Sequence, residues 1–494
     1  VRKILENDTT NNDKIQSIDQ NLAVSLALKT VFGFNNFRVG QIQAIDRFLA
    51  NKDVFIIMPT GGGKSLCYAL PSILFAGLTV VFTLLVALIE DQVGQLRCLK
   101  KLYSNAPIMM LTATCSQTEF DDIKSNLNIS QNNLEIIRAG DFSRLEISYE
   151  VRSKRDSKDE NIINIVEEIR KISMAKCIVY CSTPFECEEV STALGKILET
   201  SSLSIYHGEM PKETRKYSMS QWQKNQIQIM IATSAFGMGI DMPDVKLVIH
   251  YTFPKSITNL IQETGRAGRN GNDTTTIIYF SQRNLLTNSI IVFGKKESQP
   301  EFSSDTNEVT ILNREKRLSD AQQKLFEVLY YLNEKYECRR QMLLRYHSWD
   351  VLQDSSNMCG WCDNCQRHIT DQVQQVNATN EVERILHIIE TVLIHSSAEV
   401  VPDNIVDIFL RANNAKIRAR GYDQLSIYNI KDSDNLPWKP KILKTKELVK
   451  HALQEMVILG LVRQVILLRR YSPTSTTISH KVVVTGIAED SYDR

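Results

Sequence analysis

The sequence contains a glycine-rich run of the kind that holds phosphate groups. Between the β-rich residues Val54 to Met58 and the helical residues Leu66 to Leu70, the chain reads Pro59, Thr60, Gly61, Gly62, Gly63, Lys64 and Ser65. Small residues between a strand and a helix let backbone N–H groups approach a phosphate, and the helix N-terminus adds positive potential. In such a loop the lysine reaches the β- and γ-phosphates and the serine hydroxyl holds Mg²⁺. The run predicts an ATP and Mg²⁺ site; the alternative is a glycine turn with an incidental lysine.

Two arginines form a second candidate for phosphate chemistry. Arg266 and Arg269 stand three residues apart in the run Gln262 to Arg269, which also contains two glycines. Two guanidinium groups on one short element can point at a single γ-phosphate and stabilise the charge that develops during its transfer. The alternative is an exposed charged helix, which the glycines disfavour. Together with Lys64, these arginines are predicted to be catalytic in a site that closes when two lobes meet.

A short cluster upstream of the glycine-rich run suits a purine base. It consists of Phe34, Phe37, Arg38 and Gln41. Aromatic and guanidinium planes stack on bases, and an amide side chain pairs with the donor and acceptor atoms at a purine edge. The cluster predicts that Phe37, Arg38 and Gln41 belong to the ATP site.

Four of the ten cysteines are grouped at metal-binding spacing. Cys359, Cys362 and Cys365 follow one another at intervals of three, and Cys338 precedes them. Four thiolates with turn residues between them suit tetrahedral Zn²⁺ with no open position. The alternative is four free core cysteines. Because such sites have apparent binding energies of about 10 to 16 kcal/mol, the predicted Zn²⁺ is structural rather than catalytic, and His347 and His368 are predicted to be bystanders.

The order of apolar and polar segments predicts two α/β lobes with parallel sheets. Short β-rich runs alternate with helical stretches from about Leu22 to Tyr149, and again from about Asn161 to Phe293. The charged run Val151 to Glu160 is predicted to join the lobes. The apolar run Leu78 to Ile89 is predicted to be a buried strand, since a membrane span requires about 18 residues or more. The predicted strands include Val54 to Met58, Ile108 to Thr112, Cys177 to Tyr180, Ile227 to Ala232 and Thr275 to Phe280.

Composition limits the classes of function only weakly. The 494 residues are 43% hydrophobic with a formal net charge of +1, so any surface for a polyanion must be local. One such surface is predicted between Arg411 and Arg470, where thirteen Lys and Arg residues stand against five Asp and Glu residues. Ten cysteines without a secretory signal indicate a reducing compartment.

The last 110 or so residues have the pattern of a winged helix. Residues 381 to 487 are predicted to form three helices and then two strands, Val462 to Tyr471 and His480 to Val484, around a Ser/Thr/Pro turn. The basic excess on such a unit favours contact with duplex phosphates; the alternative is a solvated basic face. Tyr471 is either a stacking platform at a fork or an ordinary strand aromatic. The predicted DNA-binding residues are Lys439, Lys441, Lys444, Lys446, Arg469 and Tyr471.

With these motifs the sequence resembles the RecQ family of superfamily 2 DNA helicases, in its Bloom-syndrome-like branch. The likeness extends from about Val31 to the end. The resemblance implies ATP-driven 3′-to-5′ movement on single-stranded DNA, unwinding of forked or junction duplexes, and a role for Gly239, Asp241 and Gln262 in the ATP site. The matching segments are Phe37-Arg38 with Gln41, Thr60 to Ser65, Leu111 to Thr114, Tyr206 to Gly208, Phe236 to Asp241, His250-Tyr251, Pro254 to Ser256 and Gln262 to Arg269.

One segment that the resemblance implies is missing. Members of the family carry an Asp-Glu-Ala-His motif in the first lobe, and only seventeen residues separate Val93 from Leu111, where it should stand. The Asp holds Mg²⁺ through water and the Glu positions or deprotonates the attacking water. Without general-base help a rate falls by about 10² to 10⁴. The strand that ends in this motif is expected beside the phosphate-loop strand, so its loss is expected to uncover that strand.

The resemblance and the pattern together predict a fold and two functions. The expected fold has two RecA-like parallel-sheet lobes, the first truncated, then a helical zinc-binding module and a winged-helix domain. The first function is a nuclear ATP-dependent DNA helicase of repair, recombination and replication, with DNA as partner and no membrane. The second is a paralogue or gene-model fragment that binds DNA and ATP without hydrolysis. The predicted units are residues 1–21 (polar leader), 22–150 and 151–297 (lobes), 308–370 (zinc module) and 381–487 (winged helix).

Overall fold

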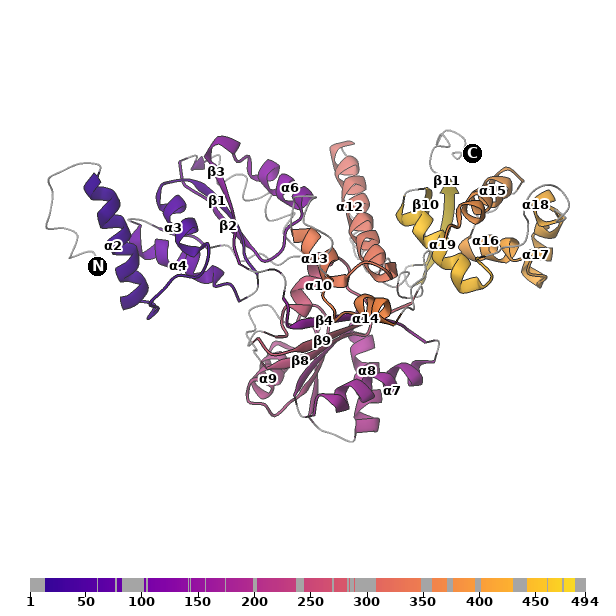
Figure 1. Cartoon of the computed structure of the whole chain (residues 1–494), viewed down its shortest axis with the longest axis horizontal. Coiled ribbons are helices and arrows are strands. Elements are labelled where there is room, and N and C mark those ends of the chain that lie inside the picture. The colour runs from indigo at the N-terminus through magenta and orange to yellow at the C-terminus, as the bar shows by residue number, and fades with distance from the viewer. Residues whose placement is uncertain are drawn as a thin grey trace.

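Four units follow one another along the chain (Figure 1). No helix among the described residues combines the length and apolar character of a membrane span. This computed structural model describes residues 14–59, 61–75, 78–81, 102–103, 105–140, 142, 144–155, 157–173, 175–198, 202–236, 244–268, 271–281, 284, 288, 308–347, 358–370, 376–395, 401–429, 442–459, 461–472 and 475–484.

The first lobe is a parallel sheet of three described strands, in the order β2-β1-β3. Its strands are β1 (Asp53–Ile57), β2 (Met109–Thr112) and β3 (Leu134–Arg138), and its helices are α2 (Lys14–Thr30), α3 (Gln41–Leu49), α4 (Lys64–Leu74), α6 (Gln117–Leu127) and η2 (Gln131–Asn133). Successive side chains of a strand point to opposite faces. Val54 and Ile56 pack with α3 and α4, whereas Phe55 and Ile57 pack with α6. All five β1 residues are therefore buried.

The neighbours of β1 correct one expectation about the missing segment. β1 pairs with β2 on one side and with β3 on the other, so its ladder groups are satisfied. The edge strands of the described sheet are β2 and β3; all four residues of β2, the strand nearest in the chain to the missing segment, are only half-buried. The missing strand would therefore uncover β2 rather than the phosphate-loop strand.

The run Leu78 to Ile89 is the second correction. Residues 78 to 81 belong to no strand, and Leu78, Val80 and Val81 are 91%, 59% and 49% exposed. The prediction of a buried strand is wrong for these residues, because the described sheet contains no strand for them to pair with. The rest of the run lies outside the described residues.

The second lobe is a six-stranded parallel sheet in the order β4-β9-β8-β5-β7-β6. Helices α7 and α8 cover one face, and Trp222 of α9 packs on the other, against Ile178 and Tyr180. The elements are β4 (Ile147–Ser153), α7 (Lys158–Lys171), β5 (Lys176–Tyr180), α8 (Pro184–Leu198), β6 (Leu203–Tyr206), α9 (Lys212–Gln223), β7 (Ile229–Ala232), β8 (Val245–His250), α10 (Ile257–Thr264) and β9 (Thr274–Phe280).

Strand β4 moves the boundary between the lobes. The expected boundary at residues 150 and 151 cuts this strand, and the expected linker Val151 to Glu160 contains its end and the start of α7. The charges that suggested a linker are explained by the strand's edge position and by ion pairs. Arg152 on β4 bonds Glu150 and Glu168, and Arg155 bonds Glu160.

Three helices form the zinc module, which covers β4. They are α12 (Glu308–Asn333), α13 (Arg339–His347) and α14 (Asp363–Ile369). One core contains β4, α10 and α12 residues together with the cysteine cluster. Val151 N donates to Asp363 Oδ2 at 3.1 Å, and Ser148 Oγ donates to the Trp361 carbonyl at 3.0 Å. The module thus satisfies polar groups at the edge of the second sheet.

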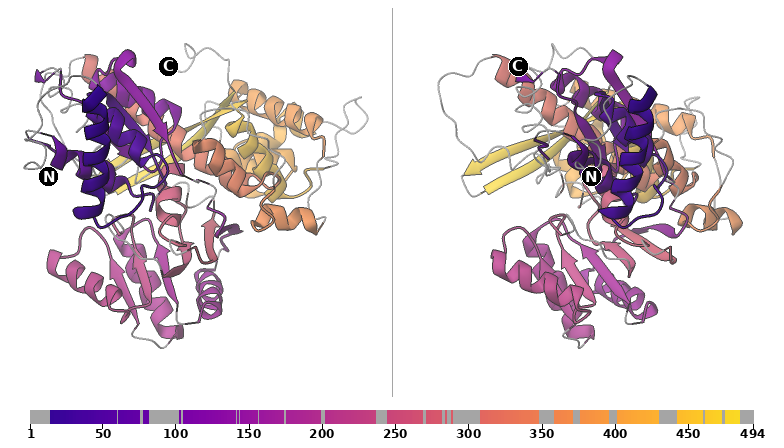
Figure 2. Two further views of the ribbon diagram at one scale, coloured as in Figure 1. Left: turned by 60° about the vertical axis from the view of Figure 1, so that its left-hand side comes forward. Right: turned by 90° about the vertical axis from the view of Figure 1, so that its left-hand side faces the viewer.

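The C-terminal unit is a helical cluster with a long hairpin. Its core is buried between α15, α16, α19 and the start of β10. Figure 2 shows the antiparallel β10–β11 hairpin extending away from the helices. Three helices were expected before the hairpin; α15, α16 and α19 are those three, and the short helices α17, η3 and α18 lie between α16 and α19. The elements are α15 (Thr379–His395), α16 (Pro402–Phe409), α17 (Ala415–Ala419), η3 (Tyr422–Gln424), α18 (Ser426–Asn429), α19 (Lys446–Ile458), β10 (Val462–Ser472) and β11 (Ser475–Val484).

Candidate nucleotide cleft and zinc centre

The glycine-rich run forms a tight loop between β1 and α4, as the sequence predicts. Gly61 and Gly63 have φ angles of +84° and +83°, a region that other residues adopt only with strain. Lys64 is the first residue of α4, and its Nζ donates to the carbonyls of Met58 at 2.9 Å and Pro59 at 3.1 Å. The loop therefore curls around the lysine ammonium, while Ser65 is exposed beside it.

The residues expected to clamp a purine lie next to this loop. Gln41 is buried, and its Nε2 donates to the Gly63 carbonyl at 2.9 Å. Arg38 donates through Nη1 to the Gly61 carbonyl, and its backbone N–H donates to Gln41 Oε1 at 2.7 Å. Phe37 packs against the apolar cluster of α2, α3 and α4. In this structure the amide and the guanidinium hold the phosphate loop rather than point to an open base site.

The second wall of the cleft comes from α10 and the turn after it. Gln262 lies on α10, and its Nε2 stands 3.5 Å from Oγ1 of Thr114, which follows β2 in the first lobe. Gly265 ends α10, so half-buried Arg266 lies in a turn rather than on the helix. The alternative of an exposed charged helix is thus wrong for Arg266. Thr60, Gly239, Asp241 and Arg269 lie outside the described residues.

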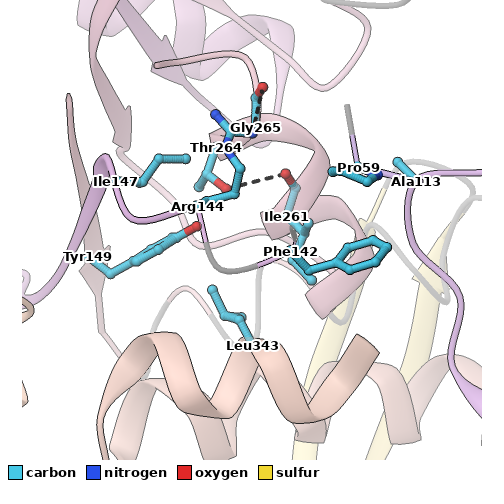
Figure 3. Close-up of a pocket in the computed structure, with 10 residues that line it drawn as sticks. All are labelled: Pro59, Ala113, Phe142, Arg144, Ile147, Tyr149, Ile261, Thr264, Gly265 and Leu343. Atoms are coloured by element: carbon cyan, nitrogen blue, oxygen red, sulfur yellow. Dashed lines mark hydrogen bonds between the residues drawn. The ribbon is translucent and has the colours of Figure 1, made fainter. Parts of the chain in front are cut away.

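A hollow between the lobes joins these two walls. Figure 3 shows Pro59 and Ala113 of the first lobe on one side, and Thr264 and Gly265 on another. Pro59 opens the phosphate loop, and Gly265 immediately precedes Arg266. The loop that carries Lys64 and the turn that carries Arg266 therefore border one cavity.

The four predicted cysteines converge. Sγ atoms of Cys338, Cys359, Cys362 and Cys365 all lie within 4.8 Å of one another, and those of Cys359 and Cys365 are 3.7 Å apart. Tetrahedral zinc with Zn–S distances of about 2.3 Å places its sulfurs about 3.8 Å apart, so the donor set fits Zn²⁺. His368 bonds the Tyr336 carbonyl at 2.7 Å and is outside the set, as predicted. The His347 side chain lies outside the described residues.

A buried ion pair beside the zinc centre was missed from the sequence. Arg339 is fully buried, and its Nε donates to Asp363 Oδ1 at 2.9 Å. The Arg339 and Arg367 guanidinium groups hold the pKa of the Asp363 carboxyl below its ordinary value, against the opposing effect of burial. In the sequence, Asp363 is simply one of the turn residues between the cysteines. Its position directly after Cys362 was the available signal, because metal-site loops are commonly anchored by such neighbours.

The zinc module also contacts both lobes near the cleft. Tyr346 Oη on α13 lies 2.9 Å from Thr258 Oγ1 on α10. Lys324 on α12 pairs with Glu119 on α6 at 3.5 Å. Because α13 contacts the second lobe and α12 contacts the first, the positions of these two helices affect how close the lobes lie.

The predicted DNA-binding residues are only partly described. Lys444 is exposed before α19, whereas Lys446 pairs with Asp407 of α16 at 2.9 Å, which raises the pKa of the lysine. Lys446 is 56% exposed, so this pair is weak and the charge stays accessible. Lys439 and Lys441 lie outside the described residues, and for Arg469 and Tyr471 only their backbone positions on β10 are described.

Three family models match the chain in order. A DEAD/DEAH box helicase model matches residues 38–141, the helicase conserved C-terminal domain matches residues 157–271, and the RecQ zinc-binding model matches residues 297–366. The matched ranges correspond to the first lobe, the second lobe and the zinc module. They contain the phosphate loop, Arg266 and all four cysteines.

Similar proteins from three organisms carry helicase names. The ATP-dependent helicase SGS1 of Saccharomyces cerevisiae is 27% identical over 82% of this chain and 32% of its own length. The putative ATP-dependent DNA helicase Q1 of Caenorhabditis briggsae is 30% identical over 67% of this chain and 65% of its own length. For the ATP-dependent DNA helicase RecQ of Haemophilus influenzae the values are 25%, 95% and 80%. The chain thus spans about a third of the yeast relative and under two thirds of the nematode one. The order of the matched models and the agreement of these relatives show that the chain belongs to the RecQ family of DNA helicases.

Proposed function

We propose that the chain is an ATP-driven motor that moves 3′-to-5′ along single-stranded DNA and unwinds forked or junction duplexes. Its proposed setting is the nucleus, in DNA repair, recombination and replication. The observation that carries the proposal is the cavity between the lobes, bordered by Pro59 of the phosphate loop and by Gly265 beside Arg266. A site divided between two lobes couples nucleotide binding to lobe movement, which is what a translocating motor requires.

The proposed chemistry assigns a task to each wall. When Mg²⁺ and ATP bind, Lys64 neutralises the β- and γ-phosphates and the exposed Ser65 hydroxyl holds the cation. For this, Lys64 must exchange its bonds to the Met58 and Pro59 carbonyls for phosphate oxygens. Arg266, with Arg269, stabilises the charge that develops on the transferred phosphoryl group. Gln262, which already faces Thr114, senses whether the lobes are closed.

We assign DNA binding to the C-terminal unit. The relatives carry DNA helicase names. The C-terminal unit, which we propose to be a winged helix, has the local excess of Lys and Arg between Arg411 and Arg470. Contacts with phosphates release counterions, so affinity should fall steeply as salt rises.

The missing acidic motif supports a second candidate function. The sequence has no Asp-Glu-Ala-His between Val93 and Leu111, and β2 has an unpaired side within the described sheet. A chain without the acid that positions water retains the groups that bind nucleotide and loses about 10² to 10⁴ in rate. The second candidate is therefore a paralogue that binds ATP and DNA without unwinding.

DNA-stimulated ATP hydrolysis by the purified chain tests the motor. The expected result is turnover that rises with single-stranded DNA and vanishes in Lys64→Ala. Lys158→Ala, an exposed lysine on α7 far in sequence from the loop, is the matched control and should behave as wild type. Turnover no higher than in Lys64→Ala, with intact nucleotide binding, would reject the motor and favour the second candidate.

A further inference from the structure

We infer that Arg144 is a positioning residue for the turn that carries Arg266. The inference rests on the proposed nucleotide cleft and adds a residue to it. Arg144 lies between β3 and β4, in the segment that connects the lobes. Its Nη2 donates to the Ala267 carbonyl at 2.5 Å, and its Nη1 stands 3.4 Å from the Gly265 carbonyl. One guanidinium group therefore holds the backbone on both sides of Arg266.

The guanidinium is itself held in place. Its Nε donates to Glu146 Oε1, and the two side chains are only 18% and 19% exposed. The Glu146 carbonyl accepts the Thr274 N–H at 2.8 Å, which ties the pair to the start of β9. Because the planar fork of an arginine has fixed directions, these bonds set its orientation as well as its position.

The turn after Arg266 is shaped to pack on this pair. Gly268 has a φ of +68°, and a Cβ added there would lie 2.7 Å from Glu146 Cγ. A larger residue would push the turn away from Glu146 and Arg144. The close approach indicates that the Arg266 turn is seated on the Arg144–Glu146 pair rather than merely near it.

The other end of the same connecting segment touches the phosphate loop. Gly140 has a φ of +101°, and a Cβ there would lie 2.8 Å from Pro59 Cδ. The Ala139 N–H donates to the Ile57 carbonyl at 3.1 Å, at the end of β1. Ala139 and Gly140 therefore contact the strand end and the loop that carries Lys64, and Arg144 and Glu146 contact the turn that carries Arg266. Figure 3 shows Arg144 beside Thr264 and Gly265, with Pro59 across the hollow.

This arrangement predicts an effect on recognition of the γ-phosphate. Arg144 does not need to touch nucleotide; it fixes the backbone from which the Arg266 guanidinium reaches. ATP and ADP differ by the γ-phosphate, so the preference for an ATP analogue over ADP reports the Arg266 contact without requiring hydrolysis. A charge-assisted hydrogen bond of this kind corresponds to about tenfold or more in affinity.

The experiment measures binding of a non-hydrolysable ATP analogue and of ADP, each with Mg²⁺, by calorimetry on the whole chain. Wild type should prefer the analogue, Arg144→Gln should lose about tenfold of that preference, and Arg144→Lys should lose less because it keeps the charge. The matched control is Arg152→Gln. Like Arg144, Arg152 is a partly buried arginine paired with glutamate, here Glu150 and Glu168. This variant should keep the wild-type preference.

A double-mutant cycle separates positioning from general damage. If Arg144 acts through Arg266, the variant with both Arg144→Gln and Arg266→Ala should lose no more preference than Arg266→Ala alone. Should Arg144→Gln fail to fold, the cycle is made with Arg144→Lys. A full wild-type preference in Arg144→Gln, or losses that add in the cycle, would overturn the inference alone; if only Arg144→Lys folds, a preference equal to that of wild type would do so. Absence of any preference in wild type would overturn the proposed cleft together with it.

Discussion

The two lobes share a parallel-sheet plan but differ in how completely their sheets are covered. The second lobe has six described strands, and its edge strand β4 bonds the zinc module through Asp363 and Trp361. The first lobe has three described strands, and its edge strand β2 is half-exposed along its whole length, as is β6 at the far edge of the second sheet. Among the described residues, the phosphate loop thus belongs to the sheet with fewer strands, and the metal centre contacts the sheet with more strands.

This difference predicts which lobe is the more stable against unfolding. Local stability follows the number of buried apolar contacts and protected hydrogen bonds. The core that unites β4, α10, α12 and the cysteines makes the second lobe and the zinc module one cooperative unit. The first lobe relies on smaller cores on the two faces of β1. We therefore expect two unfolding transitions, the first lobe melting first.

Of the changes predicted here, removal of zinc should lower the stability of the second lobe and the zinc module most. A chelator, or Cys362→Ala, should remove most of the about 10 to 16 kcal/mol of apparent metal binding energy and lower the second transition. Zinc content and thermal unfolding measure it. Cys187→Ala, a buried cysteine of α8 outside the cluster, should keep full zinc. An unchanged second transition after complete zinc loss would refute the shared unit.

The buried Arg339–Asp363 ion pair within the zinc module should have the second largest effect. Asp363→Asn leaves fully buried Arg339 without its opposite charge, at a cost of about 3 to 5 kcal/mol in the free energy of unfolding. Urea denaturation measures that cost. Glu150→Gln, which affects a partly exposed pair with Arg152, should cost at most about 1 kcal/mol. Equal costs for the two variants would mean that Asp363 does not anchor the module.

A pair of core truncations should separate the lobes. Ile56 in β1 and Ile231 in β7 are both fully buried, so each truncation to alanine should cost about 2 to 5 kcal/mol. Ile56→Ala should lower only the first transition, and Ile231→Ala only the second. Hydrogen exchange along a urea series would assign them. One transition shifted by both variants would show that the lobes unfold together.

The smallest expected effect is a pH dependence confined to the second lobe. Lys154 Nζ donates to the Tyr251 carbonyl at 2.9 Å, and burial lowers the pKa of this lysine to about 8. Between pH 8 and about 10.5 the unfolded chain binds a proton that the folded chain does not, so stability rises with pH. Relative to Lys154→Met, wild type should gain at most about 3 kcal/mol in the second transition over this range. The first transition is the internal control; a matching gain there would contradict the assignment.

Much of the local structure could be predicted from residue patterns. Five of the six strands named for the lobes are present within one or two residues, and the glycine-rich run and the cysteine spacing indicated a phosphate loop and a metal site. These features depend on φ and ψ preferences and on neighbours a few residues apart. The wrong predictions concern charged and apolar runs whose surroundings are set by residues far away in the chain. The charges of Val151 to Glu160 belong to a paired edge strand, and residues 78 to 81 are apolar without a strand to join.

The sequence by itself determined the chemistry that is available: a lysine in a glycine loop, arginines beyond α10, four thiols, and the absence of the acidic motif. Only the tertiary structure decided which groups meet. It placed β2 and β3 on either side of β1, Asp363 on a strand 212 residues earlier, and Arg144 on a carbonyl 123 residues later. Such contacts carry no local pattern, because they depend on how sheets and helices pack around shared cores and not on the residues beside them in the chain.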